Sequence, residues 1–202
     1  MEATADGSCR HSVQMIRLKQ ESRTKDKVVD NQNLRIRKVV DTYRKTLSDL
    51  EVALWEFQES SASSIAQLKN LKRLSIRLDH PHTRFSGIDP QFWETSPGST
   101  VWNILASKSG KASALGRLRS LTLERAGITD SQLAKMFESN PMLTELRLRK
   151  CYTLTDKAFK IVAESRIAPH LEILHFTKTE GEGIDERILE YIGKLPKLKV
   201  CD

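Results

Sequence analysis

One phrase, Leu-x-x-Leu-x-(Leu/Phe), occurs three times in the C-terminal half of the chain and constrains the fold more than any other feature. Its copies start at Leu118, Leu143 and Leu171, which are 25 and 28 residues apart. The last two apolar residues of each copy alternate with polar ones, so an extended strand would point the two kinds to opposite sides. One such strand cannot bury its apolar side alone. The copies must therefore stack side by side and share a core.

A second phrase follows two of these strands, Ile128-Thr-Asp130 and Leu154-Thr-Asp156, and apolar residues at helical spacing come after it. Thr129, with Gln132 three residues later, has the form of a capping box, which marks the start of a helix. A unit of strand, turn and helix with this period is typical of a leucine-rich repeat. We therefore predict an α/β leucine-rich repeat solenoid, a right-handed β-α superhelix with a parallel sheet on its concave face and about six to seven irregular repeats.

Weaker copies extend the pattern toward the N-terminus. They start at Val13, Leu47 and Leu71, and the interval from Leu71 to Leu118 is 47 residues, roughly twice the others. We predict a disordered N-terminus over residues 1–12, a divergent first repeat or capping segment over 13–46, and leucine-rich repeats over 47–202. The long interval predicts an inserted loop at about 79–99, rich in His, Pro and Gly, followed by a helix from Thr100.

The end of the chain falls within a copy of the phrase that begins near Pro196. Because the ends of a solenoid need covering, we expect either a piece of a longer array or an end covered by a partner.

Composition and motifs exclude several classes of protein. No apolar run approaches the length of about 18 residues that a membrane span needs, and the N-terminus has no signal-peptide pattern, so we expect a cytoplasmic or nuclear protein without a membrane partner. The three cysteines, Cys9, Cys151 and Cys201, are odd in number and widely spaced. This pattern fits neither a disulfide framework nor a zinc site. Nucleophile-elbow, zinc-protease and phosphate-loop motifs are lacking, so we predict no enzyme activity, catalytic residue, metal or cofactor.

The polar residues that alternate with the core leucines are the candidate binding residues, because they would line the concave face of the solenoid. Arginine side chains there suit carboxylates and phosphates, which favours an acidic or phosphorylated protein partner. The alternative is a face that is polar only because water covers it, with Glu124 between Arg77 and Arg147 neutralising both across the strands. The candidates are Arg77, Thr122, Glu124, Arg147, Arg149 and His175.

The net charge of +7 raises the possibility of a nucleic-acid partner. Residues 1–46 hold 11 Lys and Arg against 6 Asp and Glu, whereas the rest of the chain holds 22 against 20. This distribution disfavours nucleic acid as the main partner. It leaves open binding of RNA or another polyanion by the basic N-terminal segment.

The stretch from Leu143 to Asp156 resembles the cysteine-containing repeat of F-box proteins, Leu-x-x-Leu-x-Leu-x-x-Cys-x-x-(Ile/Leu)-Thr-Asp, with Cys151 at the cysteine position. Together with Leu78-Asp-His-Pro-His-Thr-Arg and Ser99-Thr-Val-Trp-Asn, the chain is similar to the repeat region of fungal F-box proteins. The resemblance implies a module that selects substrates for a Skp-cullin ubiquitin ligase. Residues 1–46 lack the usual Leu-Pro-x-Glu opening of an F-box, so a ligase partner is expected only if a longer form carries one. A repeat scaffold unrelated to ubiquitination is the alternative.

Overall fold

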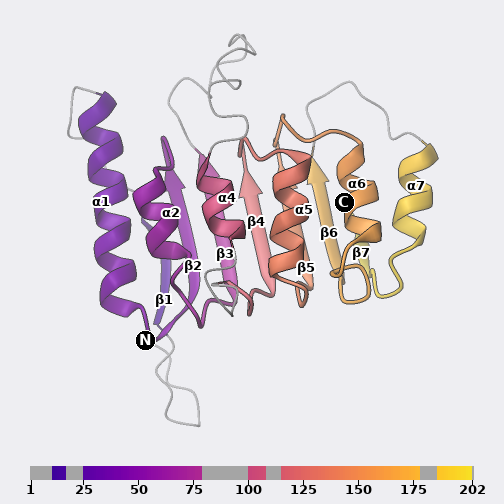
Figure 1. The fold of residues 1–202 in the computed structure, drawn as a ribbon, viewed down its shortest axis with the longest axis horizontal. Coiled ribbons are helices and arrows are strands. Elements are labelled where there is room, and N and C mark those ends of the chain that lie inside the picture. Colours follow the sequence, from indigo (N-terminus) through magenta and orange to yellow (C-terminus); the bar gives the residue numbers. More distant parts are fainter. Residues whose placement is uncertain (1–10, 17–24, 79–99, 108–114, 178–185, 202) are drawn as a thin grey trace.

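The computed structural model describes residues 11–16, 25–78, 100–107, 115–177 and 186–201, in which strands and helices alternate (Figure 1). Seven strands form one sheet in the order of the sequence, and every neighbouring pair is parallel. The strands are β1 (His11–Ile16), β2 (Leu47–Leu54), β3 (Arg73–Leu78), β4 (Ser120–Glu124), β5 (Glu145–Arg149), β6 (Ile173–Thr177) and β7 (Val200–Cys201).

The helices form a single layer over one face of this sheet, as Figure 1 shows. They are α1 (Lys25–Tyr43), α2 (Glu59–Ile65), α4 (Thr100–Ala106), α5 (Asp130–Ser139), α6 (Lys157–Glu164) and α7 (Glu186–Gly193). The α/β class and the parallel sheet predicted from the sequence are therefore confirmed, as is the helix expected from Thr100.

The core lies between the sheet and the helix layer, and the strand leucines fill it in register. Leu121 of β4 stands opposite Leu74 of β3 and Leu146 of β5, and each of the three is at most 1% exposed. On the helix side, the core contains residues such as Phe137 of α5 and Trp102 of α4. In this row leucine therefore packs beside leucine from one strand to the next.

Local hydrogen bonds fix the turns between strand and helix. Thr129 and Gln132 form the predicted capping box, since each side chain bonds to the backbone N–H of the other residue. Asp130 then accepts hydrogen bonds from both the N–H and the hydroxyl of Thr155 in the next unit, at 3.1 and 2.6 Å. The same phrase thus starts a helix and joins neighbouring units.

The N-terminal units are joined by a buried asparagine. Asn33 of α1 donates to the carbonyl oxygens of Val29 and Glu56 and accepts from the N–H of Gln58, and it is 1% exposed. Because these bonds reach the loop after β2, they hold α1 against the next unit.

Two of the segments predicted from the sequence lie partly or wholly outside the described residues. β1 begins at His11, so the last two residues of the segment predicted as a disordered N-terminus, 1–12, belong to a strand, while residues 1–10 lie outside the described part. The predicted inserted loop at 79–99 also lies outside the described residues.

Candidate functional site

The face of the sheet opposite the helices carries polar side chains, and no described helix covers it (Figure 1). This arrangement is unusual, because all-parallel sheets are normally covered on both faces. The strand register sorts the side chains of this open face into three rows that cross the strands. The first row is Asp49, Arg73, Ser120, Glu145, Ile173 and Val200; the second is Glu51, Ser75, Thr122, Arg147 and His175; the third is Ala53, Arg77, Glu124, Arg149 and Thr177.

All six candidate binding residues lie on this open face. Thr122, Arg147 and His175 are consecutive in the second row, and the other three are consecutive in the third. Arg149 is exposed, whereas the remaining five are half-buried between their neighbours.

The expected placing of Glu124 between Arg77 and Arg147 is wrong. In the observed register Glu124 stands opposite Arg77 on one side and Arg149 on the other, while Arg147 stands opposite Thr122. The carboxylate of Glu124 lies 3.5 Å from the guanidinium of Arg125, the next residue in the chain. The reason is geometric, since parallel strands pair residue by residue and Arg147 lies two residues before the partner of Glu124.

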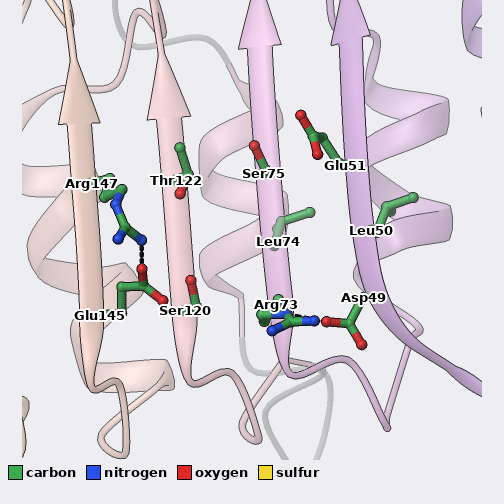
Figure 2. A pocket seen from close by; sticks show the side chains of 10 residues that line it. All are labelled: Asp49, Leu50, Glu51, Arg73, Leu74, Ser75, Ser120, Thr122, Glu145 and Arg147. Atoms are coloured by element: carbon green, nitrogen blue, oxygen red, sulfur yellow. Dashed lines mark hydrogen bonds and ion pairs between the residues drawn. The ribbon is translucent and has the colours of Figure 1, made fainter. Parts of the chain in front are cut away.

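A hollow of about 360 Å³ lies on the open face over the first two rows, and Figure 2 shows its lining from β2 to β5. The first-row residues of the hollow are not among the six candidates, although the strand pattern marks them. Each of these residues directly precedes the second leucine of its strand phrase, so the alternation of the strand continues through it. The lining residues are Asp49, Leu50, Glu51, Arg73, Leu74, Ser75, Ser120, Thr122, Glu145 and Arg147.

Ion pairs join four of the five charged side chains that line the hollow, and the fifth is Glu51 (Figure 2). Arg73 of β3 pairs with Asp49 of β2 across the strands, and Arg147 pairs with Glu145 two residues earlier on β5. Between the pairs lie the hydroxyl groups of Ser75 and Thr122. The hollow therefore offers hydrogen-bond donors and acceptors at its centre and both signs of charge at its ends.

Charge on the open face as a whole is balanced. Strands β2 to β5 place four arginines and four carboxylates on it. The arginines of the hollow are already paired with carboxylates, whose negative charge opposes the approach of another anion, and this weakens the case for a purely acidic partner on this face. The arginines are Arg73, Arg77, Arg147 and Arg149, and the carboxylates are Asp49, Glu51, Glu124 and Glu145.

Cys151 lies outside the site, immediately after β5 and Lys150. Its thiol is buried, and its sulfur lies 3.6 Å from the carbonyl oxygens of Leu123 and Arg149. Burial raises the pKa of this thiol to about 12. The cysteine is therefore a protonated packing residue at neutral pH.

Within the described ranges no group of His, Cys, Asp and Glu side chains is arranged to hold a metal ion. None of the described helices has the length and apolar character required to cross a membrane. A scan against protein-family models and a search of curated proteins each found no match for this chain.

Proposed function

We propose that the chain is a leucine-rich repeat solenoid whose open sheet face binds another protein. The observation that carries the proposal is the open face itself, where polar side chains stand in register around a hollow of about 360 Å³ and no described helix covers them. Repeat proteins use such extended faces for binding. Hydroxyl groups and both signs of charge suit the varied surface of a folded protein or a polar peptide.

The agreement between the recurring phrase and the strands supports the solenoid. Each of Leu121, Leu146 and Leu174 is the second leucine of its phrase, and the three are aligned on adjacent strands. The residue directly after the strand also has the same conformation in two units, because Arg125 after β4 and Lys150 after β5 both adopt positive φ angles, of 56° and 53°. A residue in the left-handed backbone conformation at the same point of successive units turns the chain out of the sheet in the same direction each time.

We further infer that the bound protein is a substrate selected for ubiquitination. This step draws on the resemblance of Leu143 to Asp156 to the repeats of F-box proteins, with Cys151 buried where that repeat has its cysteine. A repeat scaffold without a ligase is the competing function, and the open face would serve both.

The binding proposal is tested by affinity capture with quantitative mass spectrometry. Thr122→Arg places a long side chain in the hollow, and Arg149→Glu reverses an exposed charge on the open face. Lys135→Glu, at an exposed position on α5, is the matched control on the helix layer. We expect partners that are retained by the wild type and by Lys135→Glu but lost with both open-face variants, with far-UV circular dichroism confirming that every variant is folded. Partners retained equally by all variants would show that the open face is not the binding surface.

The ligase step has its own test. The protein expressed from its complete gene should co-purify with a Skp-type adaptor, and the captured partner should accumulate when the gene is deleted. If a partner is captured without the adaptor, and its abundance does not change when the gene is deleted, the ligase function is refuted and the scaffold function remains.

A further inference from the structure

The loops that enter β2, β3 and β4 carry a group of exposed basic side chains. Because all strands are parallel, these loops lie at one edge of the sheet, the lower edge in Figure 1. Each loop contributes two Lys or Arg residues, and every one of the six is exposed. We call this group the basic edge; it consists of Arg44, Lys45, Lys69, Lys72, Arg117 and Arg119.

Hydrogen bonds between the loops hold the basic edge together. Asn70 donates to the carbonyl oxygen of Lys45 at 2.7 Å and accepts from the guanidinium of Arg117 at 3.2 Å. The N–H of Arg119 donates to the carbonyl oxygen of Lys72 at 2.7 Å. Since neighbouring strands lie about 4.8 Å apart, the backbones of the three loops fall within about 10 Å of one another across the sheet. The six cations therefore act on the same small region of solvent.

The charge of the basic edge is not neutralised within the described protein. None of its six side chains forms an ion pair with a described carboxylate. The nearby carboxylate of Asp49 is already paired with Arg73, which is not part of the basic edge. The C-terminal part of the same edge differs, because Lys199 bonds to Glu172 at 2.7 Å, and this hydrogen bond lowers the pKa of the Glu172 carboxyl. Arg166 and Lys197 add two further exposed cations near the entrances of β6 and β7, but the larger group, of six, lies at the entrances of β2, β3 and β4, so the positive potential of this edge is strongest there.

We propose that the basic edge binds an acidic segment of a polypeptide partner. Charge complementarity selects the ligand, since carboxylates would supply the counter-charges that the described protein lacks. An extended polypeptide advances about 3.4 Å per residue, so about three residues cross from the entrance of β2 to that of β4, and a short run of Asp and Glu covers the whole group. The choice of a polypeptide rests on the proposed protein-binding function.

A second observation favours a polypeptide over single-stranded nucleic acid. Proteins that hold single strands combine basic residues with aromatic side chains on which bases stack. The described loops of the basic edge, residues 44–46, 66–72 and 115–119, contain no aromatic residue, and the exposed Tyr43 that precedes them at the end of α1 supplies a single ring instead of the series on which successive bases stack.

Fluorescence anisotropy with a labelled peptide of alternating Glu and Asp tests the proposal. Lys69→Glu/Lys72→Glu reverses two exposed charges of the basic edge that make no side-chain hydrogen bond with a described residue. Lys135→Glu/Lys157→Glu is the matched control, with the same change of net charge at exposed positions on α5 and α6. We expect the affinity for the peptide to fall about tenfold more in the basic-edge variant than in the control. Raising the salt concentration should weaken binding to the wild type.

Two outcomes would overturn the proposal. Equal losses in the two double variants would mean that the peptide responds only to net charge. Tighter binding of a single-stranded RNA of equal charge, abolished by the same basic-edge variant, would assign the edge to nucleic acid. The assay is independent of the open face, because Arg149→Glu should leave peptide affinity within about twofold of the wild type. Loss of partner capture with intact peptide binding would therefore defeat the proposed function alone, and the reverse would defeat this inference alone.

Discussion

Truncation of one core leucine tests the stacked-strand arrangement most directly. Leu146 of β5 is fully buried between Leu121 of β4 and Leu174 of β6 in the strand register. Leu146→Ala removes three carbon groups, which costs about 2.4 kcal/mol at about 0.8 kcal/mol each. A cavity that stays open adds about 24 cal/mol per Å³, for up to about 2 kcal/mol more. Because the neighbouring strands are fixed by backbone pairing, we expect little collapse and a total loss of about 4 kcal/mol.

Urea unfolding followed by far-UV circular dichroism measures this loss as a change in the free energy of unfolding. Two controls isolate the cause. Leu146→Met conserves volume and should cost less than about 1.5 kcal/mol. Arg149→Ala, on the same strand but on the open face, should change stability by less than about 0.5 kcal/mol. A loss below about 1 kcal/mol for Leu146→Ala, together with a larger loss for Arg149→Ala, would mean that the core and open faces have been exchanged.

Two further predictions concern buried groups outside the site. Asn33→Ala should lower the free energy of unfolding by about 2 to 3 kcal/mol, because it leaves the N–H of Gln58 and the carbonyl oxygen of Glu56 without the partner that this side chain supplies. A free energy of unfolding equal to that of the wild type would show that this residue does not hold α1. Since burial raises the pKa of the Cys151 thiol from 9.0 to about 12, the folded state favours the neutral form, and its contribution is complete below about pH 9 and lost as the pH rises toward 12. The stability difference between wild type and Cys151→Ala should therefore shrink over that window, and a pH-independent difference would contradict the burial of the thiol.

The spacing of residues that are close in the sequence predicted several features correctly. The alternation around Leu121 and Leu123 predicted the strand and its buried side, and the Thr129–Gln132 pair predicted the start of α5. These features depend on residues two to four positions apart, whose relative directions are set by the backbone of a strand or helix. The same alternation placed the six candidate residues on the open face.

Features that join residues about 25 positions apart could not be derived in this way. The pairing of Asp49 with Arg73, and the position of Glu124 opposite Arg149 instead of Arg147, depend on the register between strands. Register is a property of how whole units stack, and it is fixed by the summed packing of the core leucines.

The sequence by itself thus determined the α/β class, the parallel strands and which side of each strand is buried, because these follow from local periodicity. Only the tertiary structure decided which charges meet. It paired Arg73 of β3 with Asp49 of the neighbouring strand on the open face, and it gathered six cations from three separate loops at one edge of the sheet. The physical reason is that electrostatic interactions act through space over a few ångströms, and those short separations exist only once the strands lie side by side.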